Sequence, residues 1–145
     1  MNELEIKEKI YKIFPIEILN IPFIQEIINN FTIEKLPIEI TTGNHEVYKI
    51  NNYQSKISEL GLLFLFPGSG IKEHLHPKEK GISEIYTSIG ENKITWQEKK
   101  YNIQECKLGK THGVDIDNTP RIIYYNKTNE LLLKKTNQKQ KKLTP

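Results

Sequence analysis

The segment Gly68-Ser69-Gly70-Ile71-Lys72-Glu73-His74-Leu75-His76 carries the first indication of both fold and chemistry. Its two histidines, His74 and His76, are separated by one residue. On a β-strand, residues i and i+2 point to the same face, so both imidazoles can reach one ion while Leu75 points the other way. The same pair on an exposed strand can also be two surface histidines. The interpretation therefore depends on whether further ligands lie C-terminal to this pair.

A carboxylate and a third histidine lie at positions that can complete a metal site. Glu84 opens a predicted strand, 84–89, in which Glu84, Tyr86 and Ser88 share one face. Two histidines and one carboxylate leave coordination positions open for water or substrate. His112, on a later predicted strand, can supply a fourth ligand. Glu79 is the competing carboxylate, but Pro-Lys-Glu-Lys-Gly at 77–81 is typical of a solvated turn.

The order of these residues resembles the cupin superfamily. The first motif of that family places a glycine, five residues, His-x-His, a glutamate and a glycine, as at Gly68, His74, His76, Glu84 and Gly90. The second motif ends in a glycine, two residues and a histidine, with an asparagine beyond, as at 109–118. The resemblance covers residues 60–126. The chain departs from it in the longer gap between His76 and Glu84, and this longer gap, followed by Tyr86, is similar to the pattern of cupin-type phosphoglucose isomerases.

The resemblance implies a mainly β fold, the double-stranded β-helix or jelly-roll barrel, and one divalent metal ion (Fe, Mn, Zn or Ni). It implies His74, His76, Glu84 and His112 as metal ligands, and Glu84 and Tyr86 as catalytic residues. We expect a metal-dependent enzyme that acts on a small polar metabolite, either a sugar or sugar-phosphate isomerase or a dioxygenase. The alternative is a non-catalytic cupin that binds or senses a small molecule, because one fold hosts many functions.

The rest of the chain predicts one β domain with additions at both ends. Apolar residues recur at helix spacing before residue 36, so we expect a helical extension over 1–36. Strands are predicted at 38–41, 47–50, 62–66, 84–89, 93–97, 101–106, 110–116 and 121–125, which places a β-barrel over 37–133. The lysine-rich end, 134–145, contains no acidic residue and is predicted to be a disordered tail.

Composition narrows the partners and the compartment. The net charge is +3, and removing the five lysines of the tail leaves 3 − 5 = −2 for residues 1–133, so nucleic acid is not an expected partner. No apolar run is long enough to span a bilayer, no secretory signal is evident, and the single cysteine, Cys106, permits no intrachain disulfide. We therefore expect a cytoplasmic protein, with Cys106 as a packed core thiol or, alternatively, a nucleophile.

The expected partners are a small-molecule ligand or substrate and, through the apolar faces of the N-terminal helices, a second copy in a homodimer. An isomerase would need a proton-moving group, for which Glu105 is a further candidate beside Glu84 and Tyr86. A phosphate-bearing substrate would need cations at the mouth of the barrel, for which Lys110 and Arg121 are candidates. His45 lies in a polar segment and is expected to be structural or exposed.

Overall fold

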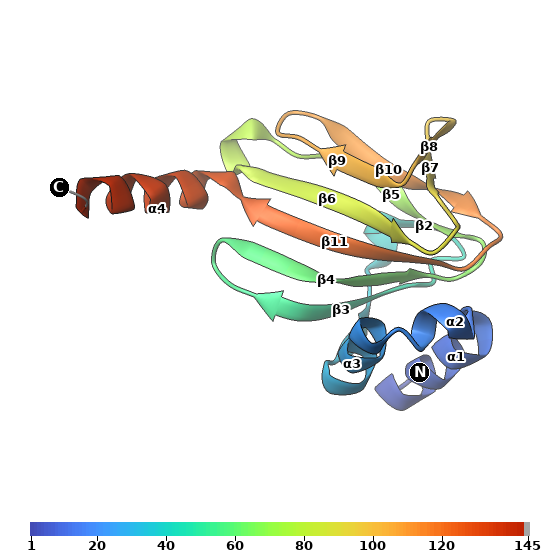
Figure 1. Ribbon diagram of the computed structural model, residues 1–145. Helices are drawn as coiled ribbons and strands as arrows, with labels where there is room; N and C mark the ends of the chain where they lie inside the picture. Colours follow the sequence, from blue (N-terminus) through green and yellow to red (C-terminus); the bar gives the residue numbers. More distant parts are fainter. Residues whose placement is uncertain (144–145) are drawn as a thin grey trace.

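The computed structural model describes residues 1–143, and the side chains of residues 1–139, as two antiparallel sheets that face each other with helices outside them (Figure 1). The larger sheet has the order β1-β3-β4-β11-β6-β9. Its strands are β1 (Ile33–Lys35), β3 (Val47–Gln54), β4 (Ser58–Leu65), β11 (Arg121–Asn129), β6 (Ile82–Ile89) and β9 (Ile103–Cys106).

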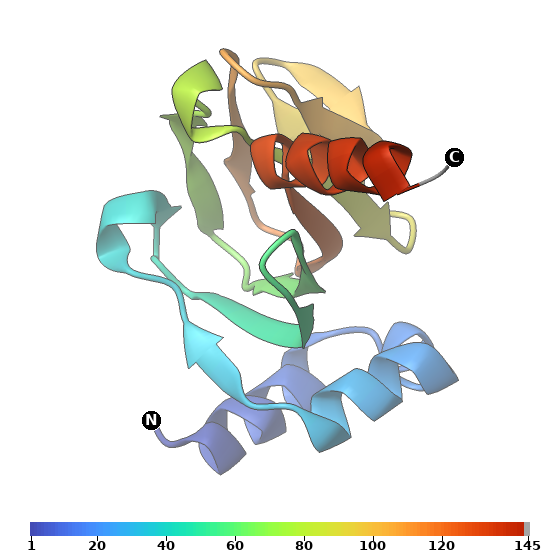
Figure 2. The same cartoon turned by 90° about the vertical axis from the view of Figure 1, so that its left-hand side faces the viewer.

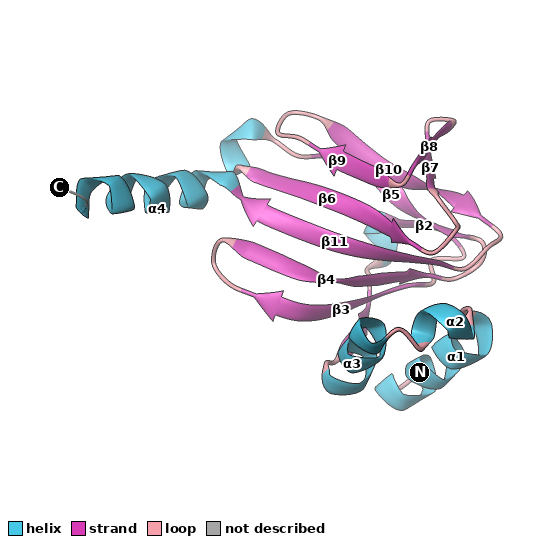
Figure 3. Ribbon diagram, viewed as in Figure 1, coloured by secondary structure: helices cyan, strands magenta, loops and turns pink. Residues whose placement is uncertain are grey.

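The smaller sheet has the order β10-β5-β2, and a short hairpin, β7-β8, lies beside it (Figure 3). These strands are β2 (Thr41–Gly43), β5 (Ser69–Leu75), β10 (Thr111–Asp117), β7 (Ile94–Trp96) and β8 (Lys99–Tyr101). Leu63 and Tyr86 of the larger sheet share one apolar cluster with Ile71 and Val114 of the smaller sheet, so the two sheets enclose a common interior. Within residues 1–143 the hydrogen bonding leaves the two sheets separate and does not close a continuous barrel.

The apolar run 62–66 explains how the larger sheet is covered on both faces. Leu63 and Leu65 point into the interior between the sheets, whereas Leu62, Phe64 and Phe66 belong to the cluster on the outer face. Strands that are buried on both faces have near-continuous apolar runs instead of alternation. The uninterrupted run in the sequence is thus a consequence of helices on the outside of this sheet.

Those helices are α1 (Glu3–Ile13), α2 (Ile16–Leu19) and α3 (Pro22–Asn30). Their apolar stripes, including Ile10, Leu19 and Ile28, are buried against the outer face of the larger sheet (Figure 2). Pro22 stands at the start of α3, where a missing N–H is tolerated. The predicted extension 1–36 is therefore part of the same packed unit, and its last residues form β1, which pairs with β3.

Two predicted elements differ in the structure. Ile38–Ile40 is a 3₁₀ turn, η1, where the alternating pattern predicted a strand, because Pro37 starts the turn and only Thr41 onward pairs with β5. Residues 130–143 form a helix, α4 (Glu130–Leu143), within the segment where the lysine-rich composition predicts a disordered tail; residues 144–145 lie outside the described part. Glu130 anchors this helix, since its N–H donates to the Gly81 carbonyl and its carboxylate accepts from Ser83.

Beyond that first turn, α4 projects away from the sheets (Figure 1). Across residues 1–143, no helix combines the length and the apolar character that a bilayer crossing requires.

Candidate metal centre

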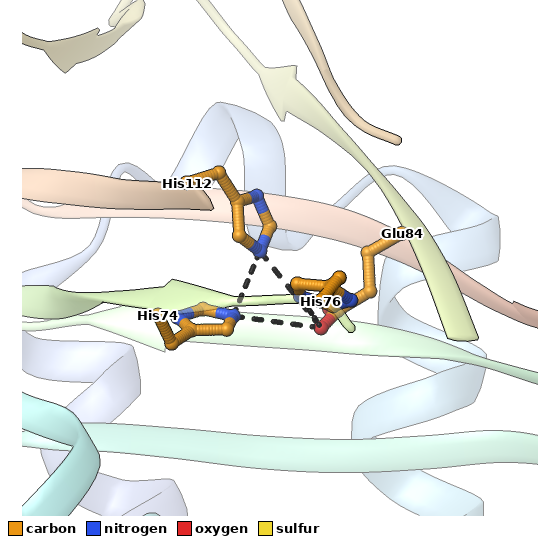
Figure 4. A group of neighbouring side chains, drawn as sticks. All are labelled: His74, His76, Glu84 and His112. Carbon is orange, nitrogen blue, oxygen red and sulfur yellow. Dashed lines mark hydrogen bonds and ion pairs between the residues drawn. The ribbon is translucent and has the colours of Figure 1, made fainter. Parts of the chain in front are cut away.

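Four side chains from three strands and a loop converge at one end of the interior (Figure 4). His74 lies on β5, His76 directly follows that strand, Glu84 lies on β6 and His112 lies on β10. One potential ligand atom from each residue lies within 4.8 Å of those from the other three. The structure thus brings together all four residues that the sequence predicts as ligands.

A local irregularity in β5 gives His74 its direction. His112 pairs with His74, and two residues later Val114 pairs with Ile71, so β5 contributes one residue more than β10 over this interval. Such a bulge reverses the side-chain alternation. His74 and Ile71 would otherwise point to opposite faces, yet both line the interior cavity. Leu75 is 56% exposed, as the alternation predicts.

Backbone carbonyls fix the orientation of two of the imidazoles. His74 Nδ1 lies 2.9 Å from the Lys72 carbonyl oxygen, and His76 Nδ1 lies 3.0 Å from that of Ile82. A carbonyl can only accept, so each Nδ1 carries the proton and each Nε2 presents a lone pair. This arrangement, in which the outer nitrogen is held and the inner nitrogen is free, is typical of metal-ligating histidines.

The inner atoms lie at the distances that neighbouring ligands of one ion have. His74 Nε2 is 2.8 Å from His112 Nε2, and His76 Nε2 is 3.2 Å from Glu84 Oε1. Ligand atoms about 2.0–2.1 Å from a shared ion and at right angles to each other are separated by about 3 Å. The buried His76 Nε2 has no hydrogen-bond partner within residues 1–143. Its lone pair faces a carboxylate oxygen, so a cation between the two atoms would stabilise both.

The electrostatics of the cluster favour a charged carboxylate. Burial raises the pKa of Glu84, but the contacts with His112, His74 and His76 outweigh burial and hold this pKa far below its usual range. Burial lowers the pKa of His112 and keeps its ring neutral. For His74, burial also lowers the pKa, yet the nearby Glu84 carboxylate and the Lys72 carbonyl leave it above its ordinary value. A charged carboxylate and neutral imidazoles are the forms that bind metal.

Tyr86 supports the cluster from the same strand as Glu84. Its ring centroid is 4.6 Å from that of His112, and it is buried. Burial, then the charge of Glu84 and a hydrogen bond to it, raise the Tyr86 pKa well above the usual value. The phenol therefore keeps its proton beside the Glu84 carboxylate. This geometry confirms the predicted proximity of the two residues.

A cavity of about 270 Å³ opens beside the cluster. Its walls are largely apolar, and the residues that line it are Leu36, Ile40, Lys49, Leu63, Ile71, His74, Glu84, Tyr86, Tyr125 and Lys127. The ligand set therefore borders a space large enough for a small molecule. The sequence alone does not identify the two lysines and Tyr125 as cavity residues, since Lys49 and Lys127 lie on strands with no motif around them.

Other candidates lie elsewhere. Glu79 is exposed on the 3₁₀ turn η2 (Lys78–Lys80). Glu105 pairs with exposed Ile85 on the outer face of the larger sheet, so it does not line the cavity. Lys110 is exposed, and Arg121 is buried with its guanidinium donating to the carbonyls of Asp115 and Ser69.

The two remaining candidates have structural settings. His45 Nδ1 lies 2.9 Å from the Thr41 hydroxyl, which agrees with the predicted structural role. Cys106 is a buried free thiol, in agreement with the packed-core prediction.

Comparison with known proteins identifies the fold. No protein-family model matches the sequence, and no curated protein is significantly similar to it. The structure is similar to an acetylacetone dioxygenase from Acinetobacter johnsonii, with a TM-score of 0.50 and 18% identity over 69% of this chain and 68% of that one. It is also similar to a putative acetylacetone dioxygenase from Methylibium petroleiphilum PM1, with a TM-score of 0.53 and 13% identity over 70% and 72% of the two chains.

A Klebsiella pneumoniae protein described as containing a double-stranded β-helix domain aligns with a TM-score of 0.48 and 18% identity, over 61% of this chain and 82% of that one. The chain has the jelly-roll, double-stranded β-helix type of fold that the two motifs predict. Its interior contains a cluster of three histidines and one glutamate that can hold a metal ion.

Proposed function

We propose that the protein is a metal-dependent dioxygenase that acts on a small carbonyl compound. Its ligands would be His74, His76, His112 and Glu84, which surround one point at the edge of the cavity. Fe(II) is the ion that suits histidine and carboxylate ligands with open positions, and when bound it would activate molecular oxygen and polarise the substrate carbonyl. The names of the two fold relatives support the same class of reaction.

The observation that carries this choice is the lack of a spare base in the cavity. Within residues 1–143, Glu84 is the only carboxylate that lines it, and its oxygen already faces three imidazoles at 3.2–3.8 Å. The Tyr86 phenol keeps its proton because burial and Glu84 raise its pKa. An isomerase that moves a proton between carbon atoms needs such a base. A dioxygenase does not need one, because the bound metal would activate the oxygen.

The chain's own residues would prepare the site in three ways. The apolar side chains of Leu36, Leu63 and Ile71 would exclude water from the cavity and strengthen electrostatic interactions inside it. The Lys72 and Ile82 carbonyls would hold two imidazoles with Nε2 facing inward. The Tyr86 hydroxyl would hold the Glu84 carboxylate in place.

A sugar or sugar-phosphate isomerase is the second candidate. It is favoured by one observation, the contact between Tyr86 and Glu84 on the inner face of β6. In that case Glu84 would leave the ligand set during the reaction to move a proton.

Oxygen uptake by the Fe(II)-loaded protein tests the proposal. Acetylacetone, β-keto acids and sugar phosphates would be supplied one at a time, with the His74→Ala/His76→Ala variant as the control. We expect oxygen consumption with a carbonyl compound and, with ¹⁸O₂, both labelled atoms in the products. Interconversion of sugar phosphates without oxygen uptake would establish the isomerase instead. Ligand binding with neither reaction would establish a non-catalytic binding protein.

A further inference from the structure

Lys127 lies next to the metal cluster on the inner face of the larger sheet. It stands on β11 directly across from Glu84 on β6 and from Glu59 on β4. Directly opposed residues of neighbouring antiparallel strands point to the same face, with Cβ atoms about 5 Å apart. Lys127 therefore lines the same cavity as His74 and Glu84.

Both carboxylates beside Lys127 are engaged with other groups. Glu84 Oε1 faces the three imidazoles, and Glu59 Oε1 lies 3.5 Å from Lys49 Nζ and accepts from the Tyr125 hydroxyl at 3.1 Å. Lys49 also pairs with Glu34 at 3.3 Å. Among the side chains that the structure describes, residues 1–139, Lys127 forms no hydrogen bond and no ion pair. A half-buried lysine that forms no ion pair is thus available at the cavity wall, close enough for its charge to act on Glu84.

From this placement we propose that Lys127 binds the carboxylate of the substrate, which makes the substrate a small keto acid and not a neutral diketone. The inference rests on the proposed function, because the keto oxygen of the same molecule would reach the metal while the carboxylate meets Lys127. The cavity of about 270 Å³ limits the substrate to a small molecule. One ammonium matches the single charge of a carboxylate, whereas phosphate sites typically gather several donors.

The apolar part of such a molecule would contact the apolar side chains that line the cavity. Leu36, Ile40, Leu63 and Ile71 line the same cavity as the metal cluster and Lys127. Lysine is also able to follow an apolar wall with its carbon chain while its ammonium stays polar. The cavity therefore combines part of the metal cluster, a hydrocarbon surface and a cation along one wall-lined hollow.

Acetoacetate and acetylacetone are a matched pair of probes, because they differ in whether a carboxylate or an acetyl group occupies one end. Their binding to the Fe(II)-loaded protein would be measured by calorimetry without oxygen. We expect the wild type to bind acetoacetate more tightly. Lys127→Gln should weaken acetoacetate binding about tenfold or more, the effect of losing one charged hydrogen bond, and should change acetylacetone binding by less than about threefold.

Two further variants make the result specific. Lys99→Gln removes the same charge from the exposed hairpin strand β8 and should leave both affinities unchanged. Lys127→Arg keeps the charge and should retain acetoacetate binding, and metal content would be measured for every variant. Equal weakening of both probes by Lys127→Gln, or no effect, would overturn the inference. If acetoacetate binds selectively but causes no oxygen uptake when oxygen is supplied, the inference about Lys127 is upheld and the dioxygenase proposal is refuted.

Discussion

His74 Nε2 and His112 Nε2 lie 2.8 Å apart, although 38 residues separate them in the sequence. They are a cross-strand pair of β5 and β10, and the bulge in β5 turns the His74 ring inward to meet His112. The outer nitrogen of His74 already donates to the Lys72 carbonyl, so its inner nitrogen can only accept. The pair therefore needs either a proton from His112 or a cation between the rings, and His112 Nδ1 is buried without a partner in residues 1–143.

Replacing His74 and His76 together by alanine should abolish metal retention and preserve the fold. Neither ring belongs to the apolar clusters that hold the two sheets together. Elemental analysis should show about one metal ion per chain in the wild type and none in the variant, with an unchanged β-rich circular dichroism spectrum. Full metal content in the double variant would show that the ion is bound elsewhere.

Glu84→Gln should weaken metal binding strongly, whereas Glu79→Gln should change it little. Glu84 is buried against three imidazoles, and an amide would replace the only negative charge in the cluster. The loss of a metal ligand should exceed the 10–100-fold that is typical of residues behind the ligands. Glu79 is exposed on η2 and serves as the matched control. Competition with a chelator of known affinity measures both, and the reverse ranking would move the site to the loop.

Metal should also raise the thermal stability of the chain. The cluster places a carboxylate oxygen 3.2 Å from the free lone pair of His76, and an ion would relieve this opposition in the folded state alone. With the ion at about 100 times its dissociation constant, binding adds about 2.7 kcal/mol to the free energy of unfolding. For a chain of this length, Tm should rise by about 5–10 °C. Differential scanning calorimetry with and without EDTA measures the change, and the His74→Ala/His76→Ala variant should show none.

The alternation of side chains along a strand made both the strands and the site residues predictable from the sequence. Alternation in 84–89 places Glu84 and Tyr86 on one face, and the structure agrees. The His-x-His spacing likewise predicts two rings on one side of a strand. Ile85 is an exception to the rule that apolar strand residues are buried. It is 40% exposed on the part of the outer face that the helices leave uncovered.

Other features depend on contacts between distant segments. The bulge in β5 arises from its pairing with β10, so no pattern within 69–76 reveals it. Lys127 is recognisable as a cavity residue only once β11 is paired with β6, since its own neighbours are polar. At 38–40 the alternating pattern predicted a strand, but Pro37 favours the turn that forms there.

Phe14→Ala should destabilise the protein by about 3–5 kcal/mol, the usual cost of removing a buried aromatic ring. The Phe14 ring packs edge-on against Phe64 and Phe66, with centroids 5.5 Å and 5.0 Å away, and joins α1 to the larger sheet. Phe31→Ala removes a ring that is 37% exposed and should cost far less. Urea denaturation followed by circular dichroism measures both. A loss of stability for Phe14→Ala that is as small as the loss for Phe31→Ala would show that the helices contribute little to the core.

Cys106 should resist alkylation in the folded protein. It lies across from Glu84 on the neighbouring strand, and it is 1% exposed, with its thiol 3.5 Å from the Lys110 carbonyl oxygen. Burial, then the charge of Glu84, raise the Cys106 pKa to about 11. Because the thiolate is the reactive form, its population at pH 8 is about a hundredfold or more below that of an exposed cysteine with a pKa of about 8.5. Raising the pH toward 11 should increase the alkylation rate by forming the thiolate, but the rate should stay below that of the unfolded protein because the thiol is buried.

Iodoacetamide followed by mass spectrometry tests this expectation, with the urea-unfolded protein as the reactive reference. The folded chain should remain unmodified over the time in which the unfolded chain reacts completely, and Cys106→Ala should show no labelling in either state. Rapid labelling of the folded protein at pH 8 would contradict the burial of this thiol. It would also restore the nucleophile as an alternative, since a reactive cysteine needs an accessible thiolate.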